Sequence, residues 1–118
     1  MSRIKIDYGI DLGTTNSAIV RMESGVPVIK KTDVQSDTMP SCVYFNKKKS
    51  ISVGQSAFNA HKRDKLSLMK SFDSNESNSF IEFKRTMGTD KTYFSSNMEK
   101  EFSSEELSSE ILKKLKSF

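Results

Sequence analysis

Short apolar runs separated by small polar residues dominate the first half of the chain, and this pattern predicts β-strands. Strands are expected over residues 8–12, 18–22 and 26–29, with turns at 13–17 and at Ser24-Gly25. Two more runs, 42–45 and 50–53, flank three consecutive lysines and predict a further hairpin. The first half therefore indicates a mostly antiparallel sheet.

Helical spacing begins after Gly54. Residues 55–61 carry alanine and phenylalanine at helical intervals and predict a short helix, and 73–78 is polar and predicts a loop. Ser79-Phe80-Ile81-Glu82 matches a capping box, in which the serine accepts from a backbone N–H and the glutamate bonds back to the serine N–H. We expect a helix to start there and to end near Gly88.

A second capping box, Ser103-Ser104-Glu105-Glu106, opens a better-defined helix. Phe102, just before the cap, is placed to pack on the first apolar residue of that helix. The apolar stripe that follows consists of Leu107, Ile111, Leu112, Leu115 and Phe118. Because the stripe is still unfinished at Phe118, we expect this face to be uncovered and to promote self-association.

Composition narrows the function classes. The chain has 118 residues, enough for one domain, and 19 basic against 15 acidic residues give a net charge of only +4. The one basic run, Lys47 to Lys49, is typical of a solvated turn, so we exclude nucleic acid as the main partner.

Cysteine content and hydropathy bear on the compartment. Cys42 is the only cysteine, which excludes an intramolecular disulfide and leaves a zinc site without ligands. It stands in an apolar run, where a buried, unreactive thiol is expected. No apolar stretch approaches the ~20 residues of a membrane span. We therefore expect a cytoplasmic protein without a membrane partner.

The stretch with the most chemical information is Asp11-Leu12-Gly13-Thr14-Thr15-Asn16. Glycine allows a ligand to approach the backbone closely, and successive N–H groups of such a turn can form an anion-binding nest. Thr14 and Thr15 add hydroxyl donors, and Asp11 can hold a divalent cation that bridges to phosphate. These residues describe a metal–phosphate site, but a simple hairpin turn with the same residues is an equally valid interpretation.

Lys84 is a second candidate. In the helix predicted after Ser79 it borders an apolar face, from which its ammonium could reach a γ-phosphate and stabilise developing charge. From the spacing alone, a lysine that only extends its charge into water is the favoured alternative.

Five segments together resemble the seventy-kilodalton heat-shock chaperones, the DnaK-like Hsp70 family. They are Tyr8 to Ala18, Thr38-Met39-Pro40-Ser41-Cys42-Val43, Val53-Gly54-Gln55-Ser56-Ala57, Phe83-Lys84-Arg85-Thr86-Met87-Gly88, and Ser104-Glu105-Glu106-Leu107 with Ile111-Leu112-Lys113-Lys114-Leu115. They follow the family order and span nearly the whole chain. This agreement in order is far more specific than any single segment.

The resemblance implies an α+β lobe of an actin-like, ribonuclease H-like ATPase. It implies that Asp11 contacts magnesium, that Gly13, Thr14, Thr15 and Asn16 form a phosphate hairpin, and that Lys84 is the catalytic lysine. ATP or ADP with Mg²⁺ would be the cofactors. Nucleotide hydrolysis would be coupled to binding of unfolded client peptides and co-chaperones, in protein folding and the stress response.

The same resemblance predicts how the chain is divided. Residues 1–36 would form the first sheet, 37–102 an outer subdomain with an insertion near 65–78, and 103–118 a helix returning to the first lobe. Asp37 departs from the arginine that many members carry there. The remaining metal ligands and the adenosine pocket would lie beyond Phe118. We therefore expect the parent to be an ATPase, and these 118 residues alone to bind ATP weakly or not at all and to be inactive.

Two alternatives remain at this point. Sugar and acetate kinases of the actin-like superfamily share an Asp-x-Gly-x-Thr hairpin, although they lack the Gly-Gln-x-Ala and Phe-Lys-Arg segments. The chain could also be a standalone interaction module.

Overall fold

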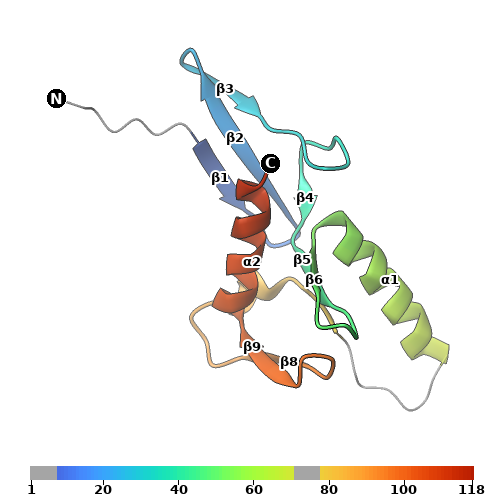
Figure 1. The fold of residues 1–118 in the computed structure, drawn as a ribbon. Coiled ribbons are helices and arrows are strands. Elements are labelled where there is room, and N and C mark those ends of the chain that lie inside the picture. The colour runs from blue at the N-terminus through green and yellow to red at the C-terminus, as the bar shows by residue number, and fades with distance from the viewer. Residues whose placement is uncertain (1–7, 71–77) are drawn as a thin grey trace.

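The computed structural model describes residues 8–70 and 78–118, and for 64–70 it describes the backbone only. In chain order the elements are β1 (Tyr8–Leu12), β2 (Asn16–Glu23), β3 (Val26–Ile29), β4 (Met39–Pro40), β5 (Cys42–Phe45), β6 (Ile51–Val53), α1 (Gln55–Lys70), β7 (Ser79–Ile81), the 3-10 helix η1 (Phe83–Thr86), β8 (Thr92–Ser95), β9 (Lys100–Ser103) and α2 (Ser104–Lys116). The mixed α+β composition with antiparallel sheets agrees with the predicted fold class (Figure 1).

The first sheet has β2 at its centre, with antiparallel partners on both sides. Ile10 of β1 stands opposite Ile19 of β2, and Asp11 stands opposite Ala18. Because side chains alternate between the faces of a strand, Ile10 and Ile19 share one face and Asp11 belongs to the other. The short β4 also pairs with β2, where Pro40 stands opposite Asn16. The predicted strands of this sheet are confirmed.

The second sheet has the order β6-β5-β7. The helix predicted from the capping box at Ser79 is wrong, because Ser79–Ile81 pairs with β5 as a strand and Phe80 stands opposite Val43. Burial of Phe80 in the core outweighs a local capping signal, since capping contributes only about 1 kcal/mol. Only the single turn of η1 follows, and Gly88 lies beyond its end.

Helix α1 runs to Lys70, well past the end predicted at His61. The added residues are mostly good helix formers without glycine or proline. It contacts β5 on the side opposite α2, so β5 and β6 lie between the two helices (Figure 1). Residues 71–77, which hold most of the predicted loop and half of the predicted insertion, lie outside the described residues.

Helix α2 begins with the predicted capping box. Ser103 accepts from the N–H of Glu106, and the Glu106 carboxylate accepts from the N–H of Ser103, both at 3.1 Å. The expectation of an uncovered stripe is wrong for Leu107, Ile111 and Leu115, which are fully buried, whereas Leu112 is 38% exposed. The buried part of this stripe therefore gives no reason to expect self-association.

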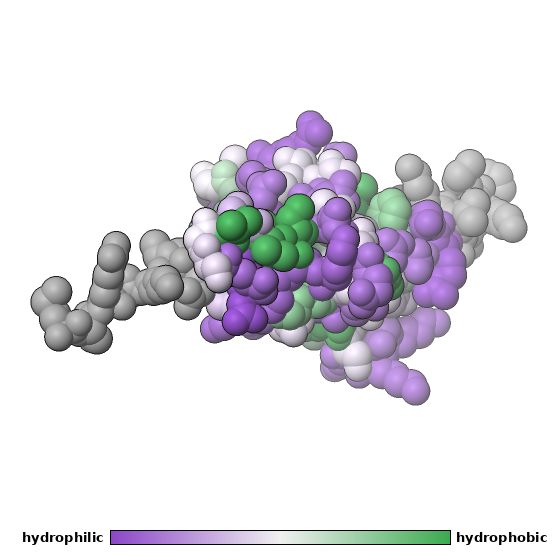
Figure 2. All heavy atoms as spheres, turned by 90° about the horizontal axis from the view of Figure 1, so that it is seen from above, coloured by the Kyte–Doolittle hydropathy of each residue, from purple (hydrophilic) through white to green (hydrophobic). Residues whose placement is uncertain are grey.

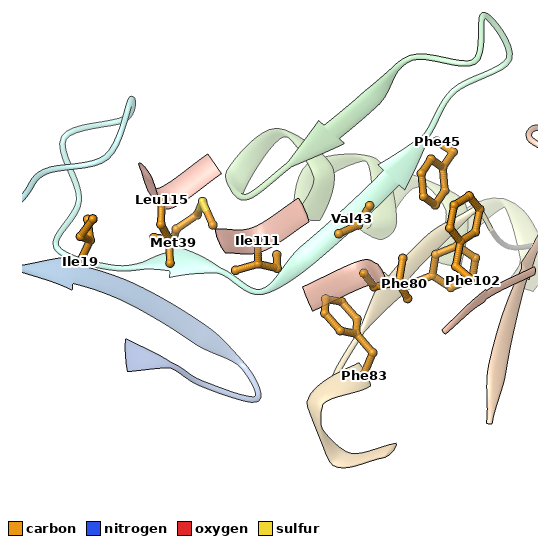
Figure 3. Close-up of a cluster of buried hydrophobic side chains, with 10 residues drawn as sticks. Ile19, Met39, Val43, Phe45, Phe80, Phe83, Phe102, Ile111 and Leu115 are labelled. Atoms are coloured by element: carbon orange, nitrogen blue, oxygen red, sulfur yellow. The ribbon is translucent and has the colours of Figure 1, made fainter. Parts of the chain in front are cut away.

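The apolar face of this helix packs into one continuous core, to which the sheets also contribute (Figure 3). It includes the stacked rings of Phe45 and Phe102, whose centroids lie 4.4 Å apart. The buried members are Ile19, Met39, Val43, Phe45, Phe80, Phe83, Phe102, Leu107, Ile111 and Leu115. The core draws on β2, β4, β5, β7, η1, β9 and α2, so all these elements share one apolar interior.

The surface is polar with a local apolar patch near β3. Viewed from above, one group of apolar side chains near the centre of the view stands out among polar neighbours, and smaller apolar areas lie elsewhere on this face (Figure 2). The large exposed apolar residues on β2 and β3 are Met22, Val26, Val28 and Ile29. Within the described ranges, neither helix combines the length and the hydropathy that crossing a bilayer requires.

Candidate functional site

The bend between β1 and β2, residues 13–16, is tightly closed. A Cβ on Gly13 would lie 2.1 Å from the carbonyl oxygen of Asn16, a distance that no real side chain tolerates. The Gly13 N–H donates to Ser17 Oγ at 3.3 Å. Glycine is therefore required here by the close approach of two backbone segments.

Strand residues behind the bend hold it in place. Ser41 Oγ donates to the Gly13 carbonyl at 2.9 Å, and the Ser41 N–H donates to the Thr15 carbonyl, also at 2.9 Å. Ser41 Oγ also lies 2.8 Å from Ser17 Oγ. The bend thus directs two of its carbonyls inward, toward Ser41, the residue between β4 and β5.

The outer side of the bend keeps free donors. Among the residues that the structure describes, the N–H groups of Thr14 and Thr15 take part in no hydrogen bond. Thr14 is half-buried and Thr15 is exposed. Two neighbouring amides without partners are what an anion-binding nest needs.

A small pocket of about 40 Å³ adjoins these threonines. Its walls come from the bend, the β4–β5 strands, α1, β7 and the residue before η1: Thr14, Thr15, Pro40, Ser41, Cys42, Phe58, Ile81 and Glu82. This volume exceeds that of one water molecule but is far smaller than the ~300 Å³ of an ordinary ligand site. By itself the pocket can hold only a small part of a nucleotide.

Asp11 is exposed at the end of β1. It forms no ion pair within the described ranges, and no group of three or more potential metal ligands occurs there. Its carboxylate is therefore available to a hydrated cation. One carboxylate supplies too few ligands for a complete magnesium site.

Lys84 lies on η1 with an exposed side chain. Glu82, two residues before it, lines the pocket beside the bend, whereas Lys84 itself is not among the residues of the pocket wall. No contact joins Lys84 to Asp11 or to residues 13–16 within the described part of the chain. The roles of Asp11, Gly13, Thr14, Thr15, Asn16 and Lys84 therefore stay predictions.

Three residues near the bend were missed by sequence reasoning. Ser17 and Ser41 are buried polar residues whose hydroxyls meet only in the folded chain, so no local pattern identifies them. Glu82 has a left-handed backbone with φ of 56°, which is uncommon for a residue other than glycine and often occurs at functional sites. Its ion pair with Arg85, at 3.9 Å, is exposed and adds little stability.

Comparison with known families adds one finding. A protein-family model described as Hsp70 protein matches residues 7–118. The match covers the bend, the pocket walls, η1 and α2, which is almost the complete chain.

Proposed function

This chain belongs to the Hsp70 family, and from this premise we propose that its β1–β2 bend and Lys84 form one wall of the Mg-ATP site of a chaperone ATPase. Family membership implies an actin-like ATPase fold and nucleotide binding with Mg²⁺ in the complete domain. The match over residues 7–118 also favours this family over the related sugar and acetate kinases.

The observation that carries the proposal is the bend itself. Its carbonyls at Gly13 and Thr15 are held inward by Ser41, while the amides of Thr14 and Thr15 remain without partners at the rim of a pocket. A preorganised pair of donors stabilises phosphate charge without having to rearrange on binding. The phosphate groups would therefore bind over Thr14 and Thr15.

The acidic and basic candidates have complementary roles in this proposal. Mg²⁺ neutralises charge on the phosphates when it is bound, and the Asp11 carboxylate would accept hydrogen bonds from its water ligands. The Lys84 ammonium, two residues after the pocket-lining Glu82, would approach the γ-phosphate. Hydrolysis requires further groups, because a site needs residues that converge from several sides.

In the complete protein we propose ATP binding and hydrolysis coupled to the binding and release of unfolded peptides, with co-chaperones as partners. We also propose a cytoplasmic location, supported by the single buried cysteine, which suits a reducing compartment. Fluorescence microscopy of a tagged protein would test the location.

The binding proposal is tested by titrating the isotope-labelled 118-residue chain with Mg-ATP and recording amide NMR spectra. Of the two outcomes expected from the sequence, weak binding or none, the preformed bend favours weak binding. We therefore expect fast-exchange shifts confined to residues 13–16 and the region of Lys84, and no phosphate release. Absence of shifts at the bend would contradict the proposed site. Tight stoichiometric binding in calorimetry would contradict the conclusion that these residues supply only one wall.

A further inference from the structure

Two buried hydroxyls stand directly beneath the bend. The exposed fraction is 1% for Ser17 and 3% for Ser41, and their Oγ atoms are 2.8 Å apart. Buried hydroxyls cost free energy unless each one is hydrogen-bonded. A serine pair in this position therefore needs a structural or functional reason.

The hydrogen-bond geometry fixes the direction of each proton. The single proton of Ser41 Oγ goes to the Gly13 carbonyl at 2.9 Å, so Ser17 must donate in the bond between the two hydroxyls. Ser17 Oγ then offers a lone pair to the Gly13 N–H at 3.3 Å. Both backbone groups of Gly13 are thus held by one connected pair of serines.

The same strand holds the other end of the bend. The Ser41 N–H donates to the Thr15 carbonyl at 2.9 Å. Ser41 therefore fixes the Gly13–Thr14 peptide unit through the Gly13 carbonyl and the Thr15–Asn16 unit through the Thr15 carbonyl, and the Thr14–Thr15 unit lies between these two anchored units. The anchored Gly13 carbonyl sets the direction of the Thr14 N–H, which shares its peptide plane, and the Thr15 N–H is restricted by the anchored units on either side.

We infer that Ser41 and Ser17 are positioning residues for phosphate binding, which act by preorganising the amides of Thr14 and Thr15. This inference rests on the proposed function and assigns the two serines an indirect role, through the backbone of the bend. A bend held in its binding shape loses less conformational freedom when phosphate binds, and affinity rises accordingly. Without the serine pair, the amides would sample other directions.

The test compares Ser41→Ala with Ser41→Thr and with a matched control, Ser95→Ala. Ser95 is also fully buried, and its Oγ donates to Asn78 Oδ1 at 2.6 Å, but it lies on β8 and does not line the pocket beside the bend. Each variant is titrated with Mg-ATP by NMR. Hydrogen exchange of the Gly13 amide is measured without nucleotide, and urea denaturation gives the stability of each variant.

For Ser41→Ala we expect about three- to tenfold weaker Mg-ATP binding, the usual effect of one lost hydrogen bond. Ligand-free amide shifts at Thr14 and Thr15 should change and Gly13 exchange should accelerate. Ser41→Thr, which keeps the hydroxyl, should restore both. Ser95→Ala should lose stability but keep the wild-type affinity.

The two possible failures are distinguishable. Wild-type affinity in Ser41→Ala, or an equal loss of affinity in Ser95→Ala, would overturn the positioning role and leave the proposed function standing. No nucleotide-induced shift in the wild-type chain would overturn the proposed function and this inference together. If Ser41→Ala fails to fold, the Mg-ATP affinity of Ser17→Ala tests the positioning role instead, because this variant removes the other hydroxyl of the pair.

Discussion

The carbonyl oxygen of Asn16 lies so close to Gly13 that a Cβ there would come within 2.1 Å of it. The narrow bend depends on this contact. We therefore expect Gly13→Ala to open the bend, to abolish the Mg-ATP-induced shifts of Thr14 and Thr15, and to cost roughly 1–3 kcal/mol through overpacking. Urea denaturation and NMR titration measure the two effects.

Gly25→Ala is the matched control for that variant. Gly25 has a positive φ of 80° in the β2–β3 turn, with open space around its Cβ position. Alanine there should be destabilising through backbone strain alone, while the nucleotide-induced shifts persist. If both variants lost the shifts equally, the narrow shape of the bend would not be the cause.

Lys84 provides a prediction specific to the γ-phosphate. Because its side chain is exposed, Lys84→Met should change stability by no more than about 0.5 kcal/mol. Under the proposed function, it should weaken binding of ATP more than binding of ADP. The exposed neighbour Arg85 provides the control, because Arg85→Gln should leave the ratio of ATP affinity to ADP affinity unaltered. An equal change in both variants would indicate general electrostatic attraction and not a specific contact of Lys84 with the γ-phosphate.

The buried face of α2 predicts a large and position-dependent stability effect. Ile111 is fully buried, so Ile111→Ala should lower the free energy of unfolding by about 2–5 kcal/mol. The adjacent Leu112 is 38% exposed, and Leu112→Ala should cost far less. Comparable losses in denaturation experiments would show that α2 is not packed as described.

Stability should fall in acid partly through the α2 cap. The hydrogen bond from the Ser103 N–H is the main reason that the pKa of Glu106 lies below its ordinary value of 4.5. A lowered folded-state pKa means that this stabilisation is present above 4.5 and is lost as pH falls through the lower value. The same direction holds for Glu105, whose pKa is lowered chiefly by the Gly88 N–H.

Glu106→Gln isolates the contribution of that charge. Glutamine can still accept from the Ser103 N–H, so the cap should survive while the acid-dependent part of its stabilisation disappears. Thermal unfolding at neutral pH and below 4.5 measures the difference between the two proteins. An identical acid dependence in wild type and variant would exclude Glu106 as a contributor.

Local signals predicted part of this fold well. The hairpins and the α2 cap are encoded by neighbouring residues, as the capping bonds between Ser103 and Glu106 show. The similar box at Ser79 failed because β5 has an edge that accepts β7, and pairing there buries Phe80. Short elements follow their tertiary partners more than their own propensity.

The candidate site, like the fold, could be predicted only in part from the sequence. Residues 11–16 carry a recognisable turn chemistry, so the bend itself could be predicted from the sequence. Ser41 and Glu82 could not, because their relation to the bend arises only when the β4–β5 segment and β7 come together. Distances between such segments are a property of the complete fold.

The shared apolar interior constrains how this part of the protein can move. Met39 contributes to it from a strand paired with β2, and Val43, four residues later, contributes from the second sheet. Rotation of one sheet against the other would have to separate the closely packed core side chains around these two residues. The free energy that this requires is more than thermal motion normally supplies. Any swinging motion that opens or shuts a nucleotide cleft should therefore carry both sheets as one body, with its pivot elsewhere.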